Sequence, residues 1–203
     1  LYAGISVLIC IAVGVPLAWV GARTKLPGRE FLDSMTTLIL ALPGTGIGIA
    51  YMRAFREPLP YLDVAFIGMW MVIPVVLGVR RLPYTVRGTF ASLQIVHKSF
   101  EEAGESVGAT KASTFKDITL PLIWKGVLVG SLYSFILALQ EASAPLLLVV
   151  PWHEMMTVGI FNFYIGGSVN EAAALGLILI VLGAVCLFVI NRVAGSKMGG
   201  VFG

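Results

Sequence analysis

Residues 1–20 contain no charged side chain, and four further apolar runs follow along the chain. The later runs lie at about residues 34–52, 64–79, 127–150 and 172–190. A helix needs about 20 mostly apolar residues to cross the hydrocarbon core of a bilayer. The sequence therefore predicts an all-α fold, a polytopic membrane bundle of about five transmembrane helices in one domain over residues 1–203.

The overall composition favours a lipid environment. Of the 203 residues, 58% are hydrophobic and 12% are charged, whereas an average soluble domain carries about twice that share of charge. The net charge of +3 does not indicate a nucleic-acid partner, because the charges sit in short clusters between the apolar runs, as membrane loops require. We therefore expect membrane lipid, and no nucleic acid, around this chain.

The basic residues predict an orientation. Twelve of the fourteen Lys and Arg residues fall in the loops after the first, third and fifth runs, and Arg53 and Arg56 fall on the other side. In this assignment Arg80 and Arg81 open the loop after the third run. Loops rich in Lys and Arg stay in the cytoplasm, so we expect a cytoplasmic C-terminus. Because Leu1 already lies in an apolar run, we interpret the chain as part of a longer protein.

The connection over residues 80–125 is too long for a simple turn. A helix is expected over about 99–107, where Ser99 and Glu102 have the S-x-x-E spacing of a capping box. Gly108 follows, and glycine suits the position just past a helix end, where the backbone is often left-handed. The sequence thus predicts a helix that ends in a glycine turn.

A second short helix is expected after this turn. Thr110 can cap it, and it is expected to run over residues 112–118. Pro121 is expected to end it, because proline lacks the amide hydrogen and clashes with the carbonyl four residues back. The connection is therefore predicted to form a helix, a glycine turn and a second helix.

Read from Glu102, this connection is similar to a known motif. It resembles the EAA motif, EAA-x3-G-x9-I-x-L-P, of permease subunits in binding-protein-dependent ABC importers with the type I, or MetI-like, fold. The matching residues are Glu102, Ala103, Gly108, Ile118, Leu120 and Pro121. Gly104 stands at the family's second alanine, and glycine loosens a helix by about 1 kcal/mol relative to alanine.

The resemblance implies a role for the loop and a set of partners. In the family this loop forms a coupling helix that docks in a groove of an ATP-binding subunit, with Glu102, Ala103 and Gly104 at its start and Gly108 at its turn. A dimer of that ATPase then binds ATP and Mg²⁺, and this chain holds no cofactor and is not itself an enzyme. A solute-binding protein outside the cytoplasm and a second permease half, identical or fused, complete the expected assembly in the bacterial inner membrane.

Two irregular segments inside the apolar runs are candidates for the translocation path. Gln140 and Glu141 interrupt the fourth run, and a carboxylate at membrane depth is costly unless it faces protein or water. Glu141 could line the path and meet a cation, or it could make a structural contact between helices. Pro43 and Gly44 break the second run, which suits either the wall of the path or a packing kink. No Gly-Lys-Ser/Thr follows them, so this is not a phosphate loop.

The segment over residues 152–167 is rich in aromatic side chains. It holds Trp152, His153, Phe161, Phe163 and Tyr164. Such a segment is typical of an aromatic belt at the membrane surface. A docking surface for a solute-binding protein is the alternative interpretation.

Catalytic and resident metal sites are not expected. His97 and His153 are isolated, and Cys10 and Cys186 lie inside apolar runs, so no metal-ligand spacing occurs. The chain also lacks the nucleophile and base constellation of a membrane enzyme.

Weaker similarities bear on the cargo. Residues 81–87, 140–143 and 160–167 resemble the ferric-iron branch of the family, and its thiamine, polyamine and phosphonate branches look similar. Iron(III) is therefore the expected cargo, and Glu141 would suit a cation. The alternative class is a secondary transporter driven by an ion gradient through Glu141. That class predicts inverted repeats, which the sequence does not show.

Overall fold

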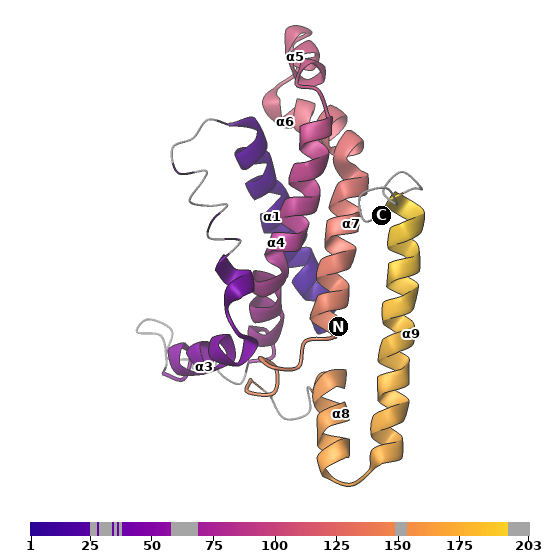
Figure 1. The fold of residues 1–203 in the computed structure, drawn as a ribbon. Helices are drawn as coiled ribbons and strands as arrows, with labels where there is room; N and C mark the ends of the chain where they lie inside the picture. The colour runs from indigo at the N-terminus through magenta and orange to yellow at the C-terminus, as the bar shows by residue number, and fades with distance from the viewer. Residues whose placement is uncertain are drawn as a thin grey trace.

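The computed structural model describes residues 1–24, 28, 34, 36, 38–57, 69–148 and 154–194, and every regular element in these ranges is helical (Figure 1). The elements are α1 (Tyr2–Arg23), α3 (Gly44–Ala54), α4 (Val72–Ile95), α5 (Ser99–Ser106), α6 (Lys111–Thr114), a π-helical turn (Phe115–Thr119), α7 (Leu120–Leu139), α8 (Met156–Ile165) and α9 (Val169–Ala194). The all-α prediction is confirmed.

Three long helices, α1, α4 and α7, lie side by side and form the centre of the molecule (Figure 1). Helices α1 and α4 run parallel, because Gly14 faces Leu82 and Thr85 while the earlier Gly78 faces the earlier Ile9. Helix α7 returns in the opposite direction, and α9 packs on α7 and α8. The C-terminal ends of α1, α4 and α9 therefore point toward the same end of the molecule (Figure 1). That end carries the tip, which we define as residues 99–114, comprising α5, α6 and the turn between them.

Helices α4 and α7 cross where both lack side chains. A Cβ added to Gly88 would lie 2.8 Å from the carbonyl oxygen of Gly126, and one added to Gly130 would lie 2.7 Å from that of Tyr84. Both contacts are with backbone, so no side-chain rotation could relieve them. Gly126 and Gly130 form a small-x-x-x-small pair, which lets two helix backbones approach closely in a membrane.

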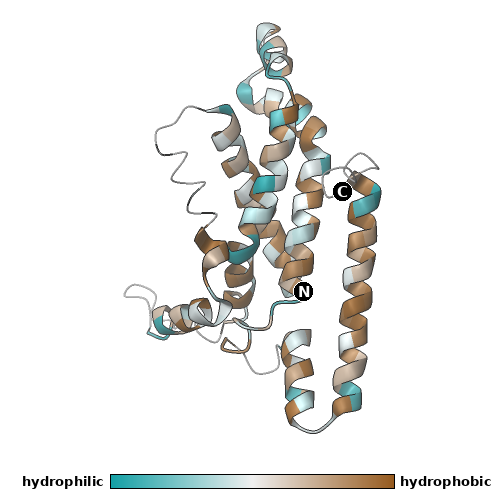
Figure 2. Ribbon diagram, in the orientation of Figure 1, coloured by the Kyte–Doolittle hydropathy of each residue, from teal (hydrophilic) through white to brown (hydrophobic). Residues whose placement is uncertain are grey.

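The outer surface of the bundle is apolar, as a lipid-facing surface must be. Figure 2 shows hydrophobic residues along nearly the whole of α9, where Leu177, Ile180 and Phe188 are exposed. Three helices in the described ranges are long and apolar enough to cross a membrane: Tyr2–Arg23, Lys111–Leu139 and Val169–Ala194. These three correspond to the first, fourth and fifth apolar runs.

The second and third runs differ from their predicted spans. The second is interrupted at Leu42 and Pro43, and α3 then runs for only 11 residues across the axis of the bundle (Figure 1). The third was expected to end near residue 79, but α4 continues to Ile95. Its first residues, 64–68, lie outside the described part of the chain.

The longer α4 corrects the placement of two charges. Arg80 and Arg81 lie inside α4 rather than in a loop, and their side chains are mostly buried. Two guanidinium groups can stay inside the bundle because Glu141 lies against both of them. Their charges interrupt the apolar pattern, and for this reason the end of the span was predicted too early. The fourth run differs as well, because α7 ends at Leu139 and residues 140–148 form turns.

Candidate functional site

The tip is built on a glycine turn. Helix α5 ends at Ser106, and Gly108 adopts a φ of 92°, a left-handed conformation that favours glycine. The Gly108 amide donates to the carbonyl of Glu105 at 3.0 Å, and the Ala109 amide donates to that of Gly104 at 3.1 Å. This pair of bonds is the Schellman motif. The predicted glycine turn is confirmed.

The predicted capping box at the start of α5 does not form. Lys98 occupies the cap position, and Ser99 already lies inside the first turn. The Ser99 hydroxyl instead lies 2.8 Å from His97 Nδ1. Glu102 points outward, with its carboxylate 3.8 Å from Lys98 Nζ. The local bond to His97 removes the serine oxygen that the capping box needs.

The second helix begins as predicted but does not end at the proline. The Thr110 hydroxyl accepts a 3.3 Å hydrogen bond from the Ser113 amide, which caps α6. The chain then stays helical from Lys111 to Leu139, straight through Pro121. A π-helical turn at Phe115–Thr119 ends two residues before the proline. We attribute the continuity to this wider turn, because proline conflicts with the regular α-helical bond to the carbonyl four residues back.

The motif residues divide into an outward and an inward set. Glu102, Ala103, Gly108, Leu120 and Pro121 are exposed. Gly104 is buried, and a Cβ at this position would lie 2.6 Å from Ile118 Cδ1. The inward pair, Gly104 and Ile118, thus fixes α5 against the π-helical turn, and the outward set remains free for contact.

Glu101 anchors the tip, and the sequence analysis did not single it out. Its carboxylate is buried, and it accepts hydrogen bonds from Arg23 Nε at 2.9 Å and from the Thr119 hydroxyl at 3.2 Å. Arg23 Nη2 also donates to the Val96 carbonyl at 2.8 Å. Glu101 therefore joins the end of α1, α5 and the helix that follows. Only its position next to the motif hinted at a role, since its partners are 78 and 18 residues away in sequence.

The tip also presents apolar side chains to solvent. Phe100 is 55% exposed and Val107 is 87% exposed. They accompany the small outward residues Ala103 and Gly108 and the acidic Glu102. A short helix with apolar and small residues on one face is suited to lie in a groove of another protein.

A second cluster lies where α7 ends. Glu141 is only 6% exposed, and its Oε2 lies 2.6 Å from Arg80 Nη1 and accepts a hydrogen bond from Arg81 Nη2. The backbone carbonyl of Glu141 accepts a 2.8 Å hydrogen bond from the hydroxyl of Thr157 in α8. We call Arg80, Arg81 and Glu141 the charge cluster. It joins α4, the end of α7 and the start of α8.

Of the four predicted path residues, Glu141, Gly44 and Pro43 lie at or beside the charge cluster, whereas Gln140 faces α9. Gly44 lies on the charge cluster, since a Cβ there would be 2.6 Å from Arg80 Nη1 and 3.1 Å from Glu141 Oε1. Pro43 precedes Gly44 at the cap of α3 and is exposed. Gln140 points elsewhere, with Nε2 3.4 Å from where a Cβ of Gly183 in α9 would lie.

The net charge of the charge cluster decides whether it can bind a cation. Two guanidinium groups surround one carboxylate, which leaves one positive charge in excess. Among the described residues, Arg81 Nε is a buried donor without a hydrogen-bond partner. A carboxylate that already contacts two arginines is not available to a cation, so the structural interpretation of Glu141 fits the geometry better. Across the described ranges, no three His, Cys, Asp or Glu residues are placed to hold a metal ion.

The aromatic segment is described only in part. Phe161, Phe163 and Tyr164 are exposed on α8. Trp152 and His153 lie outside the described residues. Exposed aromatic side chains on a short helix fit either a membrane belt or a docking surface, so both interpretations stay open.

Comparison with known proteins identifies the family. A family model described as "Binding-protein-dependent transport system inner membrane component" matches residues 11–199. The chain belongs to this family. Its resemblance to the permease subunits of ABC importers is thereby confirmed.

Several relatives carry the names of different cargoes. The ferric transport system permease protein FbpB of Actinobacillus pleuropneumoniae is 29% identical over 97% of this chain and 28% of its own length. The sulfate transport system permease protein CysT of Salmonella typhimurium is 26% identical over 92% of this chain and 70% of its own length. The molybdenum transport system permease protein ModB of Escherichia coli is 29% identical over 71% of this chain and 66% of its own length. This chain thus spans little more than a quarter of the ferric relative.

Solved structures share the fold of these inner membrane components. A chain of the MetNI methionine ABC transporter in an inward-facing conformation superposes with a TM-score of 0.72 at 16% identity, over 95% of this chain and 89% of that one. A chain of a bacterial ABC transporter that imports alginate gives a TM-score of 0.74 at 16% identity, over 94% of this chain and 74% of that one. At this identity the likeness shows the fold alone, and it confirms the MetI-like bundle.

Proposed function

We propose that this chain is a permease subunit of an ABC importer, which forms part of the translocation path and couples it to a separate ATP-binding subunit. The observation that carries the proposal is the tip. Its outward face combines Glu102, Ala103 and Gly108 with exposed Phe100 and Val107, and its inward face is fixed to the bundle. A closing motion in an ATPase that grips this face would be passed to the membrane helices.

The proposed assembly follows from this role. A dimer of ATP-binding subunits would hold ATP and Mg²⁺, and a second permease half, identical or fused, would complete the path. A solute-binding protein would deliver the cargo at the end of the molecule opposite the tip. With Arg80 and Arg81 set aside, seven of the nine other basic residues in the described part of the chain lie toward the tip. This supports a cytoplasmic tip and a cytoplasmic C-terminus in the inner membrane.

Two variants test the coupling role. Glu102→Arg reverses a charge on the outward face, and Gly108→Asp strains the turn that shapes it. Both should abolish ATP-driven uptake and weaken co-purification of the ATP-binding subunit, while the chain stays in the membrane. Glu171→Arg is the control for co-purification of the ATP-binding subunit, because Glu171 is exposed at the start of α9, at the opposite end of the molecule (Figure 1). Normal uptake in both tip variants would contradict the proposed coupling role of the tip.

For the cargo, we propose iron(III) as the first candidate. The resemblance of residues 81–87 and 140–143 to the ferric branch supports it, as does a relative named as a ferric permease. The second candidate is a small oxyanion such as sulfate or molybdate. Relatives named for those cargoes support it, and so does the excess positive charge of the charge cluster.

One experiment separates the two cargoes. The soluble binding protein that serves this permease is purified, and its bound solute is identified by metal analysis and mass spectrometry. The reconstituted importer is then supplied with radiolabelled iron(III), sulfate or molybdate. Uptake of iron alone supports the first candidate, and uptake of an oxyanion alone supports the second. Uptake of none of the three contradicts both.

A further inference from the structure

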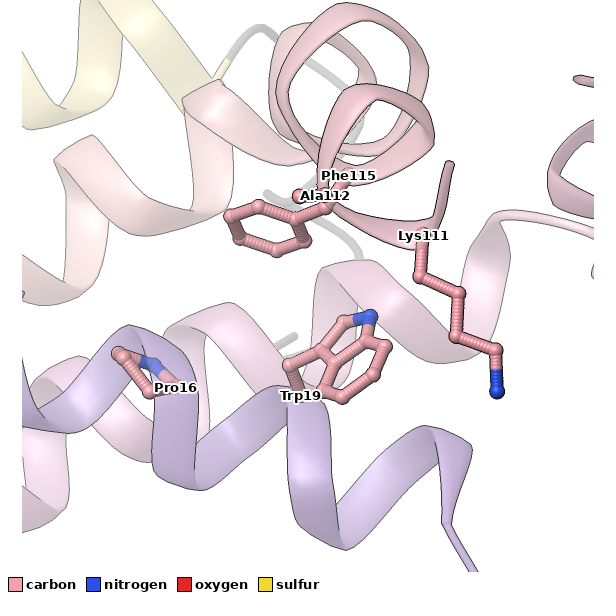
Figure 3. A pocket seen from close by; sticks show the side chains of 5 residues that line it. All are labelled: Pro16, Trp19, Lys111, Ala112 and Phe115. Atoms are coloured by element: carbon pink, nitrogen blue, oxygen red, sulfur yellow. The ribbon is translucent and has the colours of Figure 1, made fainter. Parts of the chain in front are cut away.

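A cavity of about 310 Å³ lies between the last turns of α1 and the end of the tip, where α6 passes into the π-helical turn. Its lining residues are Pro16, Trp19, Lys111, Ala112 and Phe115 (Figure 3). The rings of Trp19 and Phe115 meet edge to face, with centroids 6.1 Å apart. The volume is at the lower end of the range for ligand sites, enough for part of an acyl chain but not for a whole lipid.

The lining combines apolar walls with a single charge. Pro16, Trp19, Ala112 and Phe115 supply the walls, and Lys111 supplies the charge. Figure 3 shows the Lys111 side chain extending from α6 past Trp19, with its ammonium at the edge of the cavity, on the side of the indole away from Pro16. Lys111 is exposed, and among the described residues it forms no ion pair. The cavity therefore offers an unneutralised cation beside an apolar space, with no acidic lining residue.

The position of the cavity indicates what enters it. Pro16 and Trp19 belong to the last two turns of α1, and Lys111 opens the long helix Lys111–Leu139, so two membrane-spanning helices end here. Tryptophan gathers at the boundary between hydrocarbon and headgroups, and lysine extends its ammonium toward the headgroups. A site at this boundary would face lipid, with apolar chains on one side and phosphates on the other.

We propose that this cavity binds one anionic phospholipid, with part of an acyl chain against Pro16 and the paired rings of Trp19 and Phe115, and with the phosphate near the Lys111 ammonium. The Lys111 ammonium at the edge of this apolar cavity favours an anionic headgroup over a zwitterionic one. Because the walls belong to α1, to α6 in the tip and to Phe115 just after it, the bound lipid joins α1 to the tip. The proposal rests on the membrane location of the family and not on any particular cargo.

The test measures lipid binding by the purified permease assembly. The assembly is stripped of lipid in detergent and titrated with palmitoyl-oleoyl phosphatidylglycerol or with phosphatidylcholine of the same acyl chains, and bound lipid is counted by native mass spectrometry. The wild type should prefer phosphatidylglycerol by about fivefold or more, the effect expected of one lysine beside an anionic headgroup. Lys111→Glu should abolish the preference. Ala112→Phe should fill the cavity and reduce binding of both lipids.

Lys116→Glu is the matched control, because Lys116 is exposed on the following turn and does not line the cavity. It should leave the preference unchanged. The proposal is overturned if the wild type shows no preference, or if Lys116→Glu acts as strongly as Lys111→Glu, which would indicate unspecific attraction. It is also overturned if Ala112→Phe binds both lipids as the wild type does.

Two further measurements distinguish a bound phospholipid from free phosphate and from a protein segment in the cavity. Inorganic phosphate in large excess should not displace the phospholipid, and displacement would show a phosphate site without a role for the acyl chain. A photoreactive amino acid at position 112, in membranes with both lipids, should yield lipid adducts. Cross-links to protein in place of lipid would show that a protein segment fills the cavity and would overturn the proposal.

Discussion

Arg23 Nε lies 2.9 Å from Glu101 Oε1, and this ion pair ties the end of α1 to the first turn of α5. Each side chain is 11% exposed, so the pair is largely shielded from water. The Thr119 hydroxyl donates to the same carboxylate oxygen at 3.2 Å. A motion of the tip must therefore move α1 and the π-helical turn with it, or break these bonds.

The first prediction concerns this anchor. Glu101→Gln removes the charge and leaves Arg23 without its partner, which should lower the stability of the permease by about 3 kcal/mol. Glu102→Gln changes the same residue type one position along, where the side chain is 64% exposed and its lysine is 3.8 Å away. Exposed pairs contribute about 0–1 kcal/mol, so this control should stay near wild type. Thermal unfolding in detergent compares the two, and equal midpoints would contradict the anchor.

The contrast between the two glutamates shows what the sequence could predict. The glycine turn at Gly108 and the cap at Thr110 depend on residues a few positions apart, and both were predicted correctly. The contact of Glu101 with Arg23 bridges 78 residues, and no local pattern encodes it. Helices were likewise predicted from composition, but their ends were not.

Arg80 and Arg81 were misplaced because their contacts, too, join residues far apart in the sequence. A hydropathy pattern treats each arginine as solvated, so it placed both in a loop. Their stability inside α4 depends on Glu141, 60 residues from Arg81, and the pairing becomes visible only once α7 has folded against α4. The continuation of the helix through Pro121 was missed for a related reason, because the π-helical turn that accommodates the proline has no simple local sequence signature.

The second prediction concerns the charge cluster. Glu141→Gln leaves two buried arginines without a carboxylate, which should destabilise the permease by about 3–5 kcal/mol. Adding Arg80→Gln removes one of the stranded charges, so the double variant should be more stable than the sum of the two single effects implies. Unfolding midpoints of the four proteins form a double-mutant cycle. Additive effects would show that the two side chains do not interact.

The third prediction concerns the crossing of α4 and α7. Gly88→Val places atoms within 2.8 Å of the Gly126 carbonyl, where only a backbone shift can make room. The helices must separate, and we expect a loss of about 2–3 kcal/mol. Gly4→Ala in α1 is the control, because a Cβ there meets nothing within 4 Å. Thermal unfolding should place Gly4→Ala at or above wild type. A Gly88→Val protein as stable as the control would contradict the close crossing.

The fourth prediction uses the left-handed backbone at Gly108. A residue with a side chain is strained at a φ of 92°. This strain is smallest for asparagine and largest for a β-branched residue. Gly108→Asn should therefore retain more ATP-driven uptake than Gly108→Val, although the two side chains are similar in size. If the position mattered only for close contact with a partner, both variants would lose uptake equally. Uptake by reconstituted vesicles, normalised to the amount of permease, separates the two outcomes.

The fifth prediction concerns the glycine that replaces the family's second alanine. Gly104→Ala should gain about 1 kcal/mol of helix propensity, but its methyl group would lie 2.6 Å from Ile118 Cδ1. That atom is the flexible end of a side chain, so we expect the two effects nearly to cancel. Ile118→Val removes the clashing atom and by itself costs about 0.5–1.5 kcal/mol.

The pair of substitutions should then behave non-additively. With Ile118→Val in place, Gly104→Ala keeps its propensity gain without the clash, so the double variant should be more stable than Ile118→Val alone by about 1 kcal/mol. Gly176→Ala in α9, where nothing lies within 4 Å, measures the propensity gain by itself. If Gly104→Ala is as stabilising alone as with Ile118→Val, then Gly104 and Ile118 are not in contact, and the smaller residue at this position has another cause.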